Sequence, residues 1–448
     1  MAYQDLREFL ASVAGDILRV SPEFDPKFEM AALLHETQSD GRIVLFENVK
    51  GHPGVSVMGN LLSSRARTAK AIGTTEEKLN QTYLNCKKHA LSPVMFEGVA
   101  PVKEVIHRNP VDVAALLPML TYHEKDVAPF ITCGLVLAKD PATGRRAMGI
   151  HRMMFQGGNR FGIFLANPPL SLFFQQAEEE DRPLEIAVAL GVDPATLLAA
   201  VVKVGATGPD KLEVAGGLRG LPLELTPAET VDIDVLARAE IIIEGHILPG
   251  VREQEGPFGE NTGYYFSNIS PVVEVTAVTH RKDFIFAALC PWTVDVDNLL
   301  SLASGTELLG QLQNQIHGVV DLELITGTCG FTAVIAVKDC QPTDVRRLIQ
   351  LVLSLDLRLK IVTVVDDGVD IRNPREVSWA LATRFQPDRD TVLLDKMAGY
   401  VIDPSAVESG TGSKIGFDAT RGPGEQFDAI SIPVAAATKA RAVLAELV

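Results

Sequence analysis

Two glutamates in one short segment offer the clearest chemistry in this 448-residue chain. Glu255 and Glu260 lie five residues apart in REQEGPFGENTGYYF (252–266), with the sequence GPFG between them. On an ideal strand residues i and i+5 point to opposite faces, and on a helix their directions differ by about 140°. A Gly-Pro…Gly turn brings both carboxylates to one side. Because adjacent acids repel, one is expected to keep a proton near neutral pH and to deliver it.

The same pattern also fits a solvated acidic hairpin, since surface loops are often acidic. The segment GTGSKIG (410–416) has neither the spacing nor the preceding strand of a phosphate-binding loop. The chain contains no GxSxG and no HExxH.

Three stretches of different pattern must position these acids, and together they predict an α+β fold. Residues 1–110 mix helical segments such as FEMAALLHE with short strands such as RIVLFENV. Residues 111–295 are strand-rich, with EIIIEGHI and PVVEVTAVTH, and form a central β domain. Residues 296–448 alternate strands and helices as an α/β domain, ending in the amphipathic segment VAAATKARAVLAELV. This terminal helix packs either within the chain or against a partner subunit.

The composition limits the class of protein. A formal charge of −16 and a pI near 5.1 argue against general nucleic-acid binding. No apolar run approaches the roughly 18 residues that span a membrane, and the acidic N-terminus is not a signal peptide. The five cysteines form no CxxC pair, which is typical of buried thiols in the cytoplasm, and no structural zinc site is expected.

The segment EGPFGENTGYY resembles the signature of the UbiD family, the decarboxylases that use prenylated flavin mononucleotide (prenylated FMN). Four further segments resemble the family in the same order: GIHRM, LEIAVALGVDPATLLAA with KLEVAGGLRGLPLEL, VVEVTAVTHRKDFIF and GTGSKIGFDATRG. The resemblance implies that the central domain is a flavin-reductase-like split barrel. It also implies that the C-terminal domain carries the contacts of a homodimer or homohexamer.

The resemblance also implies roles for individual residues. Arg152 in GIHRM, Glu255 and Glu260 correspond to a Glu–Arg–Glu network. A guanidinium can hold carboxylates with a fork of donors, so Arg152 would orient the substrate or a glutamate. Glu260 would be the proton donor, and Glu255 would tune Arg152. Asn261, which follows Glu260, is expected beside the substrate.

The cofactor is expected to contact residues in two parts of the chain. His151 and Lys414 are candidates for its phosphate, and Asn167 is the nearest polar residue where the family has a histidine. Met153 is assigned to the cofactor site as well, although it also fits core packing. The family's phosphate is bridged by Mn²⁺ with K⁺ nearby. Here Glu213 fits one metal ligand, but Ala147 stands where an asparagine is expected.

The resulting prediction is reversible, non-oxidative decarboxylation of an aromatic, heteroaromatic or α,β-unsaturated acid, with release of CO₂. Side chains provide no electron sink for this reaction, so a cofactor is required, and a flavin prenyltransferase would supply it. Two alternatives stay open. One is a flavin oxidoreductase that binds FMN on the same barrel, and the other is a non-catalytic family member that has lost its cofactor.

Overall fold

The computed structural model describes residues 3–108, 110–165, 167–205, 208–406, 410–421, 430 and 432–447. Helices and strands are mixed along the chain, and within these residues they form four sheets, which confirms the predicted α+β class. The first sheet has the order β1-β2-β3-β16. Its strands are β1 (Ile17–Val20), β2 (Ile43–Phe46), β3 (Ser56–Gly59) and β16 (Ile285–Ala287).

Among the described residues, four α-helices lie in the same N-terminal part of the chain as β1, β2 and β3. They are α1 (Leu6–Ser12), α2 (Glu29–Thr37), α3 (Arg65–Ala71) and α4 (Leu79–Leu84). The helical spacing read from the sequence in DLREFLASV and FEMAALLHE corresponds to α1 and α2. The side chain of Asp5 accepts from the backbone N–H of Glu8 and so fixes where α1 begins.

A nine-stranded sheet forms the centre of the molecule. Its strands follow the order β6-β9-β10-β15-β14-β11-β7-β8, with β5 paired to β15. The bounds are β5 (Val105–Arg108), β6 (Phe130–Ile131), β7 (Leu135–Lys139), β8 (Arg146–Ile150), β9 (Met153–Phe155), β10 (Arg160–Ile163), β11 (Leu184–Leu190), β14 (Ile241–Gly259) and β15 (Tyr265–His280). The two longest strands, β14 and β15, are antiparallel neighbours joined by a tight connection.

Short elements surround the central sheet. The helices are α5 (Val113–Leu116), α6 (Leu170–Glu179), α7 (Pro194–Ala200) and α8 (Lys211–Arg219). A three-stranded sheet contains β4 (Val94–Met95), β12 (Glu224–Pro227) and β13 (Asp234–Leu236).

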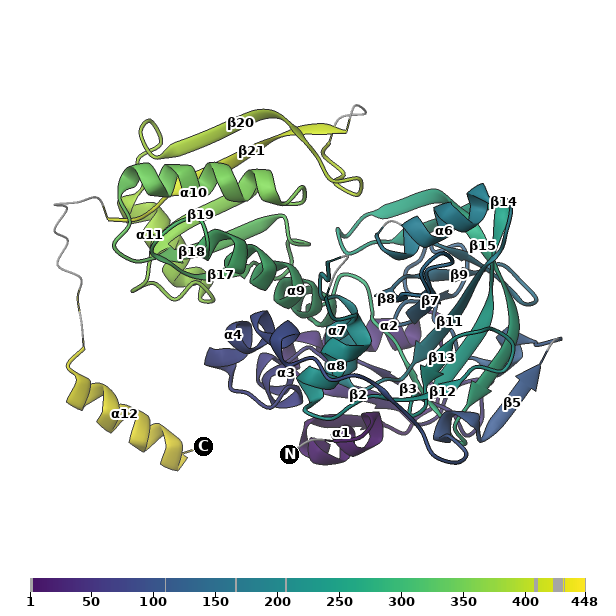
Figure 1. The fold of residues 1–448 in the computed structure, drawn as a ribbon. Helices are drawn as coiled ribbons and strands as arrows, with labels where there is room; N and C mark the ends of the chain where they lie inside the picture. Colours follow the sequence, from purple (N-terminus) through teal and green to yellow (C-terminus); the bar gives the residue numbers. More distant parts are fainter. Residues whose placement is uncertain are drawn as a thin grey trace.

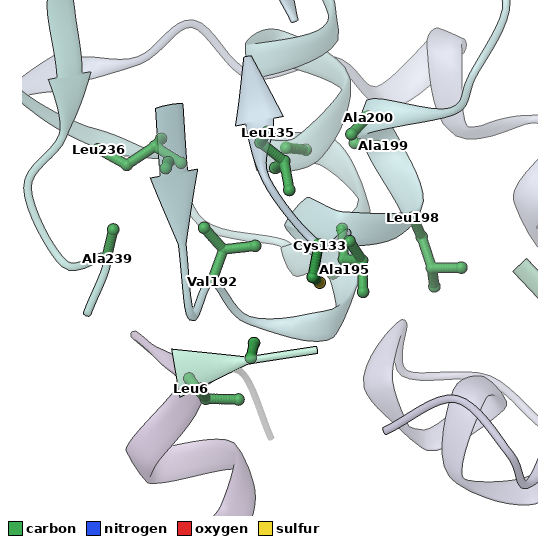
Figure 2. Close-up of a cluster of buried hydrophobic side chains, with 14 of the residues drawn as sticks. Leu6, Cys133, Leu135, Val192, Ala195, Leu198, Ala199, Ala200, Leu236 and Ala239 are labelled. Carbon is green, nitrogen blue, oxygen red and sulfur yellow. The ribbon is translucent and has the colours of Figure 1, made fainter. Parts of the chain in front are cut away.

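The core of the N-terminal stretch continues into the central sheet. One cluster of buried side chains runs from Leu6 in α1 through Leu135 and Ala195 to Leu299. Figure 2 shows Leu6 below Val192 and Ala195, from elements almost two hundred residues apart in the sequence. The pairing of β16 with β3 links the same two regions through backbone hydrogen bonds. The N-terminal stretch therefore folds against the central sheet.

The last third of the chain forms a separate lobe around a five-stranded sheet of order β17-β18-β19-β21-β20 (Figure 1). The strands are β17 (Val319–Leu324), β18 (Thr332–Val337), β19 (Ile361–Asp366), β20 (Thr391–Ala398) and β21 (Thr411–Asp418). The helices are α9 (Val294–Gln313), α10 (Pro342–Leu355), α11 (Pro374–Arg384) and α12 (Val434–Leu447). Helix α9 runs from the central region into this lobe, and α12 stands apart from both. No described helix combines the length and apolar character that crossing a bilayer requires.

Candidate active site

A bulge in strand β14 brings the two glutamates to one face. Glu255 pairs with Asn268 and Phe258 pairs with Phe266, so β14 uses three residue steps where β15 uses two. One extra residue reverses the strand's alternation, and side chains five apart then point the same way. The sequence predicted a turn within GPFG. Instead β14 continues to Gly259, and the chain reverses afterwards, where the N–H of Glu260 donates to the carbonyl of Tyr264.

Glycine is required at the bulge. Gly256 has a φ of +96°, and a Cβ built there would lie 2.6 Å from the carbonyl oxygen of Phe266. A side chain would therefore push β14 and β15 apart at the point where the register shifts. Gly256 therefore permits the bulge that places both acids on one face of the strand.

Arg152 lies between the two carboxyl groups, in the connection between β8 and β9. Its Nε and Nη2 donate to the two oxygens of Glu255 at 2.7 and 2.8 Å, and its Nη1 forms an ion pair with Oε1 of Glu260. The side chains of Arg152, Glu255 and Glu260 are 9%, 0% and 10% exposed. The structure therefore brings these three predicted residues together in a nearly dry environment.

Three aromatic rings surround the guanidinium. Its carbon lies 4.5 Å from the ring centre of Phe164, 4.9 Å from that of Phe258 and 5.6 Å from that of Phe266. A cation over an aromatic face is stabilised by the ring quadrupole, and the rings exclude water. The sequence analysis did not identify these rings, although Phe258 and Phe266 lie within the acidic segment itself.

The two glutamates differ in their access to solvent and to ligands. Glu255 is fully buried, and both of its oxygens are held by Arg152, with the Ser270 hydroxyl 3.5 Å from Oε2. Glu260 lines a cavity, where its Oε2 accepts the N–H of Asn261 at 3.2 Å. Glu260 is therefore the acid that can exchange a proton with a bound molecule.

The cavity has a volume of about 260 Å³ and lies between the central sheet and the C-terminal lobe. The central part contributes His151, Arg152, Phe164, Asn167, Glu260 and Asn261, among others. The C-terminal part contributes Leu299, Leu300, Cys329, Arg358, Tyr400 and Ile402. A largely apolar pocket with a few convergent polar groups is typical of a binding site for a small organic ligand. No sequence signal pointed to Arg358 or Tyr400, because they come from separate loops.

His151 enters this cavity as a neutral ring. Burial lowers its pKa from 6.5 to about 4. Its Nδ1 is 3.0 Å from the carbonyl oxygen of Phe164, which can only accept, so Nδ1 carries the proton. The remaining nitrogen, Nε2, is then a hydrogen-bond acceptor. It suits a hydroxyl group better than a phosphate oxygen.

Of the other residues predicted to bind cofactor or substrate, two line the cavity and two do not. Asn167 and Asn261 line the cavity, and the Oδ1 of Asn261 accepts the N–H of Trp292. Met153 is fully buried in the core, where β9 pairs with β6. Lys414 lies in β21, and its ammonium donates to the carbonyls of Leu353 and Asp356, each at 2.9 Å. Met153 and Lys414 are outside the cavity lining.

The residues considered for a metal do not form a site. Glu213 closes a capping box at the start of α8, accepting the N–H of Asp210 at 2.8 Å and the hydroxyl of Ser92 at 3.1 Å. Ala147 is buried in β8 and offers no ligand atom. Across the described ranges, no group of three or more His, Cys, Asp or Glu side chains is placed to hold a metal ion.

Comparison with known families and proteins agrees with the sequence resemblance. Three family models match consecutive parts of the chain. They are the N-terminal (11–86), Rift-related (95–293) and C-terminal (297–419) domains of 3-octaprenyl-4-hydroxybenzoate carboxy-lyase, named UbiD. The matched residues cover most of the sequence.

Individual relatives are similar over nearly their whole length. Anhydromevalonate phosphate decarboxylase from Methanothermobacter thermautotrophicus is 33% identical over 437 residues, covering 95% of this chain and 99% of its own. The UbiD-class enzyme HmfF from Pelotomaculum thermopropionicum, solved with FMN, superposes with a TM-score of 0.91 at 40% identity, covering 96% and 97% of the two chains. An evolved dimeric form of HmfF, solved with prenylated FMN, gives 0.89 at 38%, with the same coverage. The chain therefore belongs to the UbiD family of carboxy-lyases.

Proposed function

We propose that this chain catalyses the reversible, non-oxidative decarboxylation of an aromatic, heteroaromatic or α,β-unsaturated carboxylic acid, with prenylated FMN bound in the cavity. The observation that carries the proposal is Arg152 held between Glu255 and Glu260 at the cavity wall. The binding of FMN and prenylated FMN by HmfF supports the choice of cofactor.

The cavity suits the flat, largely apolar ring system of the cofactor. Phe164, Phe258 and Leu289 offer apolar surface, while Asn167 and the Nε2 of His151 offer polar contacts for a hydroxylated chain. Prenylated FMN supplies the electron sink that side chains lack when CO₂ leaves an unsaturated carbon. The proposal assigns no step to a metal, because Glu213 is engaged in the cap of α8 and no metal-binding group of His, Cys, Asp or Glu side chains occurs among the described residues.

Arg152 has donors left for the substrate. Of its five N–H groups, Nε and one on Nη2 serve Glu255, and one on Nη1 serves Glu260. One N–H on each Nη nitrogen remains, and together they form a fork that matches a carboxylate. Glu255 keeps the guanidinium in place, because its two hydrogen bonds fix the plane of the group. Arg152 therefore orients the carboxyl group that is to be lost.

Glu260 delivers the proton that replaces CO₂. It is the acid that reaches the cavity, and the N–H of Asn261 holds its Oε2. The proton passes from the Glu260 carboxyl group to the substrate carbon, and Glu260 recovers a proton from water between turnovers. In the carboxylation direction Glu260 removes the same proton as a base.

The test uses protein co-expressed with a flavin prenyltransferase. It is incubated with cinnamic, furoic, pyrrole and benzoic acids while CO₂ is monitored, and CO₂ release from at least one acid class is expected. Two results would contradict the proposal. Oxidation of NADH or NADPH without CO₂ release would indicate a flavin oxidoreductase. Protein that stays colourless after co-expression would indicate a non-catalytic family member.

The proposal includes assembly through the C-terminal lobe as a homodimer or homohexamer, by analogy with the dimeric form of HmfF. The expected result of light scattering on the purified protein is a mass of two or six times 48.3 kDa. A mass of 48.3 kDa at micromolar concentration would contradict this part of the proposal.

A further inference from the structure

The C-terminal wall of the cavity carries its own cation, which the proposed reaction does not use. Arg358 lies between helix α10 and strand β19, and Tyr400 follows strand β20. Both line the cavity that Arg152 and Glu260 line from the other side. The apolar side chains of Leu299 and Leu300 occupy the same wall.

The guanidinium of Arg358 is fixed in place with one end open. Its Nε and Nη2 donate to the carboxylate of Asp356 at 3.2 and 2.6 Å, and its side chain is 15% exposed. The backbone N–H of Arg358 also donates to Asp356, at 2.9 Å. Its Nη1 has no hydrogen-bond partner among the residues that the structure describes. A rigid, partly desolvated donor on a cavity wall is prepared for an acceptor.

Asp356, the carboxylate that pairs with Arg358, also has two lysines near it. Lys414 donates to the backbone carbonyl of Asp356. Lys203 interacts electrostatically with the side-chain carboxylate of Asp356. Three cations therefore gather around one acid. At the opposite wall, one guanidinium is placed between two carboxyl groups. Of these three cations Arg358 lines the cavity, so this wall presents a cation to a ligand, whereas the opposite wall presents the carboxyl group of Glu260 beside Arg152.

Tyr400 adds a neutral donor beside Arg358. Burial raises the pKa of its phenol, so the hydroxyl stays protonated at neutral pH. A guanidinium and a phenol on one wall match the oxygens of a carboxylate or phosphate.

We infer that Arg358 and Tyr400 form an anion subsite, which binds a second acidic group at the end of the substrate remote from the carboxyl group that is lost. The inference rests on the proposed function and narrows it to dianionic acids. The second group is a carboxylate or a phosphate monoester. A second acidic group would pair with the Nη1 donors of Arg358 through charge-assisted hydrogen bonds, whereas a monoacid would leave them to water, so the subsite favours acids with two anionic groups.

The test measures binding separately from turnover. Isothermal titration of FMN-loaded protein compares benzoate with terephthalate, and cinnamate with 4-carboxycinnamate and 4-phosphonooxycinnamate. The wild type is expected to bind the dianions at least 100-fold more tightly than the matched monoacids. Of the two dianionic cinnamates, the tighter binder identifies the second group as carboxylate or phosphate. Equal affinity for monoacids and dianions would overturn the inference, whatever the CO₂ assay shows.

Substitutions test whether Arg358 and Tyr400 cause the preference for dianions over monoacids. Arg358→Gln is expected to lower dianion affinity about 100-fold and to leave monoacid affinity unchanged, and Tyr400→Phe to lower it several-fold. Arg347→Gln, at an exposed arginine of α10, is the matched control and should change neither. Because Arg358→Gln leaves a buried carboxylate alone, the double variant Asp356→Asn/Arg358→Gln provides a second test with the same expected loss.

A flavin phosphate offers the same chemistry as the proposed second group, and a further measurement distinguishes the two. The affinities of FMN and of riboflavin are determined for wild type and Arg358→Gln. An unchanged preference for FMN over riboflavin supports the inference. If Arg358→Gln removes that preference, the subsite belongs to the cofactor and the inference is wrong.

Discussion

The two walls of the cavity each present an arginine, and the surroundings of the two arginines differ. Arg152 comes from the central sheet, where two carboxyl groups and three aromatic rings enclose it. Arg358 comes from a loop of the C-terminal lobe, where one carboxylate and two lysines lie near it.

This difference separates acid–base chemistry from simple binding. Around Arg152 the second carboxyl group has direct access to the ligand, so a proton can move between Glu260 and the substrate. Around Arg358 the carboxylate of Asp356 is engaged by both Nε and Nη2. On the proposals above, the arginine at one wall positions the substrate beside the proton donor Glu260, and the arginine at the other wall binds a second anionic group.

The largest expected effect comes from making one substitution at both walls. Arg152→Lys is expected to lower kcat/KM about 10³-fold, because a point charge cannot hold Glu255 and a substrate carboxylate through separate forks. Arg358→Lys keeps a positive charge for the second acidic group, so a loss of about 10-fold is expected. Steady-state CO₂ release measures both. Equal losses in the two variants would remove the distinction between the walls.

An effect of intermediate size concerns acid stability at the central wall. Burial lowers the pKa of His151 to about 4 in the folded protein, whereas its ordinary value of 6.5 applies to the unfolded chain. Between these values the unfolded chain binds the extra proton, so folding stability falls as the pH drops from 6.5 toward 4, by about 3 kcal/mol. Urea unfolding at several pH values is expected to show this slope in wild type and to lose it in His151→Asn.

The exposed His317 provides the control for that experiment. The variant His317→Asn should keep the wild-type pH dependence. A slope that persists in His151→Asn would show that other groups cause the acid sensitivity.

The smallest expected effect concerns the support of the C-terminal wall. Lys414 is 3% exposed, and its ammonium donates to carbonyls at the end of α10. Lys414→Met would leave these carbonyls without their donor and lower stability by about 2 kcal/mol. Thermal unfolding against the exposed-lysine control Lys439→Met measures this loss. Unchanged stability with weaker flavin binding would instead favour the phosphate contact predicted from the sequence.

Most of the fold was predictable because its signals are local. Helical spacing in FEMAALLHE and apolar runs such as KIVTVVDD each require only neighbouring residues. The family was predictable as well, since its motifs are contiguous and the comparisons confirm it. The bulge at Gly256 was not predictable, because it appears only when the register of β14 against β15 is known.

The residues of the C-terminal wall could not be predicted from the sequence, for a different reason. Arg358 and Tyr400 are separated by 42 residues, and both are about 200 residues or more from Arg152. No local spacing connects them, and the packing of two lobes brings them to one cavity. Lys414 shows the converse. As a basic side chain in a segment that resembles the family, it was a candidate for the cofactor phosphate, and the structure shows its ammonium donating to carbonyls at the end of α10.

The central claim is that Glu260 moves the proton while Arg152 and Glu255 hold the geometry. The most direct measurement is solvent-deuterium exchange at the substrate carbon, followed by NMR in the cofactor-loaded variant Glu260→Gln. This substitution keeps the shape and an oxygen to pair with Arg152, so the cofactor should stay bound. The account predicts that both exchange and CO₂ release disappear. Exchange at the wild-type rate in Glu260→Gln would contradict it.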